Sequence, residues 1–124
     1  MERITIKDKT FAINIPESRI QERIVQMAKE INADMKGKSP VFLGVLNCAF
    51  LFAADVFKNL DVECEITFLR VSSYEGTSST GTVKNLVGVS ASLKDRTVVI
   101  LEDIVDTGDT AVYLLQEIEK HGPK

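Results

Sequence analysis

The sequence has neither an excess of basic residues nor a long apolar run. Its 124 residues include 15 Lys and Arg against 18 Asp and Glu, a formal net charge of −3. Proteins that bind nucleic acid through its phosphates need a basic surface, so this balance argues against a nucleic-acid partner. No apolar run has the length of a membrane-spanning helix, and the segment from Met1 to Ile4 lacks a signal-peptide pattern. We therefore expect no membrane association and a cytoplasmic location.

Cysteine and histidine are also scarce. Cys48 and Cys64 both stand in apolar segments, so we expect two buried, reduced thiols rather than a disulfide or a metal site. The single histidine, His121, stands at the end of a predicted helix, where it would interact with the helix dipole rather than act in catalysis. The composition, 44% hydrophobic and 27% charged, is ordinary for a globular protein and predicts a single domain over residues 1–124.

The stretch from Thr97 to Thr110 carries the strongest functional signal. The apolar run Val98–Leu101 predicts a parallel strand buried on both faces. Apolar residues at helical spacing predict a helix over residues 111–120. Between the two lie acids and a turn of small residues, namely Glu102, Asp103, Asp106, Thr107, Gly108, Asp109 and Thr110. Because ligands of open α/β sheets bind at the carboxyl ends of the strands, we expect the binding site here.

These residue types suit a phosphorylated sugar with a divalent cation. The free N–H groups and the dipole at the start of a helix favour a phosphate, and Thr107, Gly108 and Thr110 add hydroxyls and close backbone approach. Glu102 and Asp103 can accept hydrogen bonds from sugar hydroxyls or hold a hard cation such as Mg²⁺. Asp106 lies between these two features and can accept or donate a proton.

The rest of the chain predicts alternating strands and helices. A capping box of Ser18 and Gln21 is predicted to begin the first helix, whose apolar stripe runs from Ile20 to Met35. The other predicted elements are strands at 4–6, 11–13, 41–46, 64–71 and 83–89, and a helix at 50–60. Ser72 to Thr82 is predicted to be a polar loop, either a mobile surface segment or a lid over the site.

The run Val98–Thr110 resembles the phosphoribosyl-pyrophosphate binding motif of type I phosphoribosyltransferases, most closely that of the hypoxanthine(-guanine) branch. The resemblance implies a Rossmann-like α/β fold, a parallel sheet flanked by helices with a flexible loop and a partial hood. It also implies transfer of 5-phosphoribosyl to a 6-oxopurine, hypoxanthine or, as the second candidate, guanine, with Mg²⁺ and with pyrophosphate leaving. Asp106 would then be the general base, Glu102 and Asp103 would hold the ribose and the metal, and residues 106–110 would bind the 5′-phosphate.

Two further segments take roles from this resemblance. Leu46, Asn47 and Cys48 match the loop that binds pyrophosphate through its backbone, in which a cis peptide is typical between the positions of Leu46 and Asn47. Ser73 and Tyr74 match a Ser-Tyr pair at the start of a flexible lid, which would shield a reactive ribose from water.

The resemblance covers about the first two-thirds of a typical member. The last core strands and the segment that grips the purine have no counterpart here, so we expect a C-terminally truncated chain with an unpaired sheet edge. Such a chain would have little or no turnover of its own. The family implies a homo-oligomer, a dimer or tetramer, and the exposed edge favours self-association.

Four alternatives can be weighed against this interpretation. Asp106-Thr107-Gly108 is also an aspartic-protease signature, but that fold needs β structure after the turn. An apolar strand ending in Glu102-Asp103 resembles a receiver domain, in which the acidic pair lies early in the chain. A non-catalytic regulator could use the same fold to sense phosphoribosyl pyrophosphate or a nucleotide. Finally, the acids could be solvated residues at a strand end without a function.

Overall fold

The computed structural model describes residues 2–75, 82–89 and 92–124, with the side chains of 72–75 and 82–87 left out. Within these residues a four-stranded sheet has the order β5-β4-β3-β6, and a separate hairpin precedes it. The sheet strands are β3 (Val41–Leu46), β4 (Glu65–Glu75), β5 (Thr82–Val87) and β6 (Val98–Leu101). β3 pairs in parallel with β4 and β6, whereas β5 pairs with β4 antiparallel.

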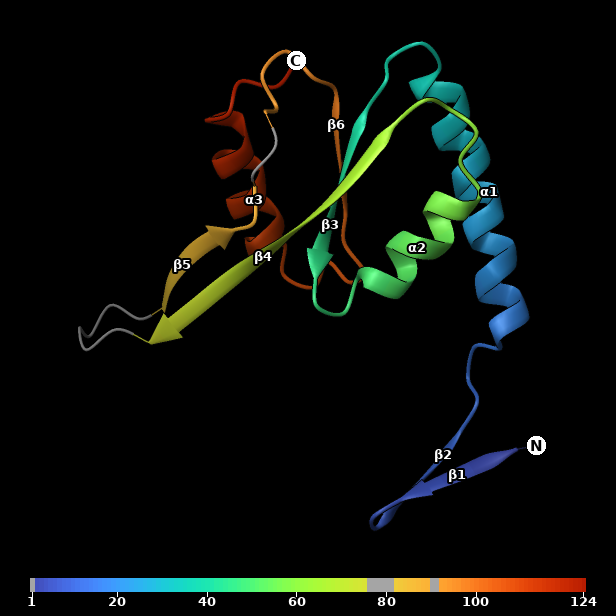
Figure 1. Ribbon diagram of the computed structural model, residues 1–124. Helices are drawn as coiled ribbons and strands as arrows, with labels where there is room; N and C mark the ends of the chain where they lie inside the picture. The colour runs from blue at the N-terminus through green and yellow to red at the C-terminus, as the bar shows by residue number, and fades with distance from the viewer. Residues whose placement is uncertain (1, 76–81, 90–91) are drawn as a thin grey trace.

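Helices cover both faces of this sheet. Figure 1 shows α1 (Glu17–Met35) and α2 (Phe50–Lys58) on one side and α3 (Asp109–Glu119) on the other. Side chains alternate along a strand, so β3 contributes to two cores. Val41, Leu43 and Val45 pack in the core that contains Leu114 and Ile118 of α3. Phe42 packs in the core that contains Ile24 of α1 and Val56 of α2. The predicted α/β sheet with flanking helices is confirmed.

The amino-terminal hairpin, β1 (Arg3–Ile6) with β2 (Lys9–Ala12), forms a sheet of its own. It projects away from the main sheet beyond the start of α1 (Figure 1). We call it the arm. Its strands agree with the predicted pair to within about two residues at each end, an ordinary error for element boundaries.

The start of α1 differs from the predicted capping box. Pro16 is the N-cap residue and is extended, with φ −71° and ψ 153°, and no side chain caps the helix. The Pro16 carbonyl accepts hydrogen bonds from the N–H groups of Arg19 and Ile20. Gln21 instead donates to Asp55 Oδ2 of α2 at 3.0 Å. The predicted capping box was wrong because the helix begins two residues earlier, after Pro16, whose ring fixes φ at a value suited to that position.

Two expectations about burial also need correction. β6 is an edge strand within the described sheet, so Val98, Val99 and Ile100 are half-buried rather than buried on both faces. Both cysteines are free, but Cys48 is exposed and Cys64 is half-buried. Partial burial raises the pKa of the Cys64 thiol. Cys48 is exposed because it follows β3 in the turn before α2, beyond the buried part of the strand.

Arg96 ties together three segments at the amino ends of the strands. Its Nη2 atom donates to the Ser39 carbonyl at 3.1 Å and to Glu65 Oε1 at 3.1 Å. We expect Arg96→Met to lower the free energy of unfolding by about 1 kcal/mol, since both bonds are partly solvated. Urea titration followed by circular dichroism measures this. Arg70→Met, an exposed arginine of β4, is the control; an equal loss in both variants would contradict the role of these bonds.

Candidate functional site

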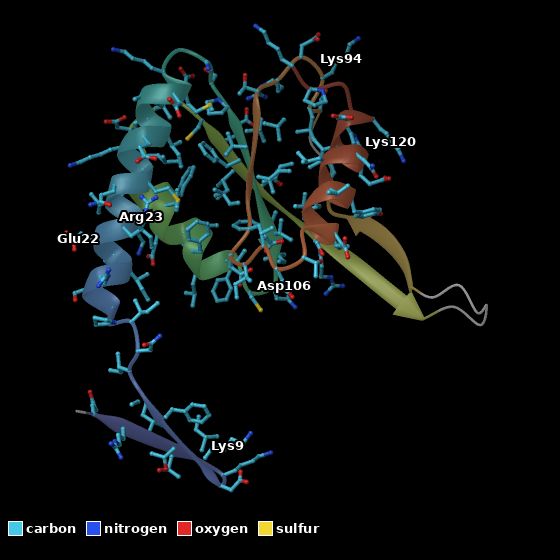
Figure 2. All side chains as sticks on the ribbon, turned by 180° about the vertical axis from the view of Figure 1, so that it is seen from behind. Lys9, Glu22, Arg23, Lys94, Asp106 and Lys120 are labelled. Carbon is cyan, nitrogen blue, oxygen red and sulfur yellow. The ribbon has the colours of Figure 1, made fainter. Side chains whose placement is uncertain are left out.

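The carboxyl ends of β3 and β6 lie side by side and carry the two loops singled out in the sequence. Gly44 pairs with Leu101, and β3 continues to Leu46. The loop 46–48 therefore begins beside the first residues after β6. Figure 2 shows Asp106 at this end of the sheet, opposite the end that carries Lys94.

The acidic loop surrounds a hollow of about 200 Å³ at the start of α3. Its lining residues are Glu102, Ile104, Val105, Asp106, Thr107, Gly108, Thr110 and Ala111. Gly108 is the N-cap residue of α3 and is left-handed, with φ +88°. This conformation favours glycine because it carries no Cβ. The left-handed turn directs the chain into α3, so that free N–H groups at the start of the helix lie beside the hollow.

A second hollow, of about 270 Å³, joins the acidic loop to the loop after β3. It is lined by Val45, Leu46, Asn47, Cys48, Val71, Glu102, Asp103 and Thr110. The peptide bond between Leu46 and Asn47 is cis, as the resemblance implied. Glu102 and Thr110 line both hollows, so the two hollows are parts of one site.

Hydrogen bonds within the acidic loop orient its acids. The Asp103 N–H donates to Glu102 Oε1 at 3.1 Å, and the Ile104 N–H donates to Asp103 Oδ1 at 2.9 Å. The Asp109 N–H donates to Thr107 Oγ1 at 3.3 Å. Each of these bonds uses one oxygen atom of the acceptor side chain, and a carboxylate oxygen can accept more than one hydrogen bond. Both acids therefore keep oxygen atoms for a ligand.

The pKa of Glu102 is raised above its ordinary value of 4.5. Partial burial is the largest cause; a side-chain hydrogen bond with Asp103 and repulsion from its charge add to it, whereas the Asp103 N–H acts in the opposite direction. Ionised Glu102 thus costs the folded state free energy near neutral pH. A bound cation or sugar hydroxyl would compensate for that cost.

The raised pKa predicts a pH-dependent gain from Glu102→Gln. A raised carboxyl pKa stabilises the fold below the unfolded-state value of 4.5, and this contribution is lost as the pH rises through the folded-state pKa. We expect the variant to melt at a higher temperature than the parent at pH 7, with the difference disappearing below pH 4.5. Glu119→Gln, at the exposed end of α3, is the control. A gain that does not change with pH would contradict this assignment.

The predicted lid residues lie on a strand. β4 continues to Glu75, so Ser73 pairs with Lys84 and Tyr74 with Val83. The predicted loop therefore overlaps β4 at 72–75 and β5 at Thr82, because polar residues also form strands when a partner strand supplies hydrogen bonds. Its middle, 76–81, lies outside the described residues. The lid role of Ser73 and Tyr74 stays a prediction.

Val71, Ile104 and Val105 line the hollows but were not among the predicted site residues. Val71 lies one residue beyond the last parallel pair of β4, Leu46 with Arg70. Its position at the end of a parallel strand was the signal that could have identified it. Ile104 and Val105 are 74% and 62% exposed, and they stand inside the motif itself.

One alternative fails on the structure. Asp106-Thr107-Gly108 leads into helix α3 rather than into β structure, which contradicts the aspartic-protease interpretation.

No helix in the part of the chain that the structure describes is long and apolar enough to cross a membrane. Among those same residues no three His, Cys, Asp or Glu side chains form a metal-binding group, so a cation at this site would rely on the Glu102–Asp103 pair.

The family model of the phosphoribosyl transferase domain matches residues 16–124. The chain belongs to this family, and its architecture is the type I phosphoribosyltransferase fold. Over 109 residues it is 37% identical to the hypoxanthine-guanine phosphoribosyltransferase of Lactococcus lactis, covering 87% of this chain and 60% of that protein. It is 41% identical over 106 residues to the bifunctional protein TilS/HprT of Listeria innocua, covering 85% of this chain and 16% of that one.

Solved structures agree with this assignment. The crystal structure of a hypoxanthine phosphoribosyltransferase from Staphylococcus aureus superposes with a TM-score of 0.77 at 29% identity, over 91% of this chain and 62% of that one. The chain therefore spans no more than about 60% of the curated relatives described above. Family membership also contradicts the receiver-domain alternative.

Proposed function

We propose that this chain provides the phosphoribosyl-pyrophosphate site of a hypoxanthine phosphoribosyltransferase, with guanine as the second candidate base. The observation that carries the proposal is the convergence of the two loops. The two adjoining hollows share Glu102 and Thr110 as lining residues, and the second hollow is also lined by Leu46, Asn47 and Cys48. Relatives named hypoxanthine-guanine phosphoribosyltransferase support this activity. The reaction moves 5-phosphoribosyl to a purine nitrogen and releases pyrophosphate, as a step of purine salvage yielding IMP, or GMP from guanine.

Each loop has a separate task in this proposal. Residues 106–110 bind the 5′-phosphate through N–H groups and hydroxyls at the start of α3. Leu46, Asn47 and Cys48 bind pyrophosphate, and Ser73 and Tyr74 belong to the lid. Asp106, which is exposed beside the first hollow, takes the proton from the purine. Residues 1–124 then form one domain of a cytoplasmic, homo-oligomeric protein.

Glu102 and Asp103 are the proposed ligands of Mg²⁺. Adjacent carboxylates fit this ion, which usually takes one or two carboxylates together with water and substrate phosphates. When bound, Mg²⁺ neutralises the pyrophosphate charge and polarises the bond to the leaving group. The two carboxylates also accept hydrogen bonds from the ribose hydroxyls and stabilise positive charge that develops on the ribose.

Calorimetric titration of phosphoribosyl pyrophosphate tests the proposal. We expect binding that requires Mg²⁺, and we expect Asp103→Asn to weaken it about tenfold, as the loss of one metal-orienting group does. Asp34→Asn, which removes the same charge from the exposed surface of α1, is the control and should bind like the parent. Binding that is independent of Mg²⁺, or equal in the two variants, would contradict the proposal.

A further inference from the structure

The two hollows of the site have acidic walls. Glu102, Asp103 and Asp106 line them, and no lysine, arginine or histidine of the described residues does. In the function proposed above, the substrate brings both a phosphate and a pyrophosphate group to these walls. Proteins usually meet such groups with arginine or lysine side chains. We therefore looked for a cationic side chain just outside the hollows.

Arg70 is the only basic residue in the three parallel strands as the structure describes them, β3, β4 and β6. It pairs with Leu46 in the last parallel pair of β3 and β4. Leu46, its neighbour across the sheet, and Val71, its neighbour along the chain, both line the second hollow. Since adjacent strands lie about 4.8 Å apart, the backbone of Arg70 borders that hollow.

The side chain of Arg70 leaves the sheet on the face that α2 covers. Val71 packs against the core on the α3 face, and successive residues of a strand point to opposite faces. Phe68 shares the face of Arg70, and a Cβ built at Gly44 would meet the Phe68 ring and, at 3.5 Å, Ala53 of α2. The loop after β3 leads to α2 on this same face (Figure 1). Arg70 and the loop proposed to bind pyrophosphate therefore lie on one side of the sheet.

No acid among the described residues holds Arg70 in an ion pair. Arg70 is exposed, and none of the ion pairs within residues 2–75, 82–89 and 92–124 includes it. Arg96, at the opposite end of the strands, is by contrast paired with Glu65. An arginine has a long flexible stem and a planar head that can bind two oxygen atoms of one phosphate. Arg70 can therefore bend over the end of β3 toward an anion there.

We propose that Arg70 binds the pyrophosphate group of phosphoribosyl pyrophosphate. This inference rests on the proposed function and adds a residue to it. β3 lies between β4 and β6, so Arg70 and the Glu102–Asp103 pair stand on opposite sides of the loop after β3. The guanidinium meets the pyrophosphate from one side, and the two carboxylates with their cation meet it from the other. Positive charge beside the leaving group stabilises the charge that the group gains as its bond to the ribose breaks.

Calorimetric titration with three ligands in the presence of Mg²⁺ tests this role. The ligands are phosphoribosyl pyrophosphate, inorganic pyrophosphate and ribose 5-phosphate. We expect Arg70→Met to weaken the binding of the first two about tenfold, as the loss of a charged hydrogen bond does. Binding of ribose 5-phosphate should not change, because the proposed 5′-phosphate position at the start of α3 does not involve Arg70.

Two further variants separate a charge contact from a structural effect. Arg23→Met, which removes an exposed arginine of α1 labelled in Figure 2, is the control and should bind all three ligands like the parent. Arg70→Lys keeps the charge but loses the planar head, so its affinity for pyrophosphate should lie between those of the parent and of Arg70→Met. Circular dichroism checks that each variant folds.

The outcomes distinguish this inference from the function on which it rests. A folded parent that does not bind phosphoribosyl pyrophosphate would contradict the proposed function, and the role of Arg70 with it. A parent that binds the ligand no better than Arg70→Met would overturn the role of Arg70 alone. Equal weakening of all three ligands by Arg70→Met would also overturn that role, because the loss would then not come from the pyrophosphate contact.

Discussion

Phe42→Ala is expected to lower the free energy of unfolding by about 3–5 kcal/mol. Phe42 is fully buried on the central strand β3, where it packs in one core with Ile24, Ala53 and Leu101. Removing the ring leaves a cavity between the sheet and the two helices, and the neighbouring backbone cannot collapse to fill it. A domain of this size has about 5–15 kcal/mol of stability in total, so a large part of it would be lost.

Urea titration monitored by circular dichroism gives this value. Phe50→Ala is the matched control, because Phe50 at the start of α2 is 52% exposed and its removal leaves no cavity. We expect the control to cost less than about 1 kcal/mol. Similar losses in both variants would mean that the core between β3 and the helices is not packed as described.

Gly108→Val is expected to weaken the binding of phosphoribosyl pyrophosphate about 100-fold, or roughly 2.7 kcal/mol. Gly108 has φ +88° at the start of α3, and a β-branched residue is strained there. Apart from the neighbouring residues 107 and 109, no heavy atom of the described residues lies within 4 Å of the place that a Cβ would occupy at this position, so the effect comes from the backbone alone. Relief of the strain would turn the peptide groups of the loop away from the position proposed for the 5′-phosphate.

Gly37→Val supplies the matched control for this prediction. Gly37 has φ +78° after α1, and a Cβ at this residue would likewise meet no atom within 4 Å. Both substitutions should therefore cost about 1–2 kcal/mol of stability through the same backbone strain. Only Gly108→Val should change the dissociation constant in calorimetry. An equal loss of affinity in the two variants would show that binding follows overall stability rather than loop geometry.

The core strands and the site loops could be predicted from the sequence because their signals are local. The apolar runs at Val41–Leu46 and Val98–Leu101 are strands in the structure. Of the acids and small residues after the second run, Glu102, Asp106, Thr107, Gly108 and Thr110 line a hollow at the start of α3. A parallel strand, a polar turn and an amphipathic helix each have a distinct residue pattern, and here the three agree.

The features that could not be predicted depend on contacts between distant segments. Gln21 bonds to Asp55 of α2 rather than capping its own helix, and nothing in the local sequence specifies that partner. Val71 lines the site only because β4 lies beside β3 in parallel register. Tyr74 lies in a strand because β5 supplies hydrogen bonds to a segment with the composition of a loop. Tertiary pairing overrides local propensity in such places.

The position of β6 links ligand binding at the acidic loop to strand pairing at the edge of the sheet. This short strand pairs with β3 on one side only, among the described residues, and it leads directly into Glu102 and Asp103. A strand added to its open side would restrict the motion of the backbone that carries Glu102 and Asp103, two residues of the proposed phosphoribosyl site. Thermodynamic linkage then requires the two effects to be equal. If the added strand changes the affinity for the ligand by some factor, the bound ligand changes the affinity for the strand by the same factor.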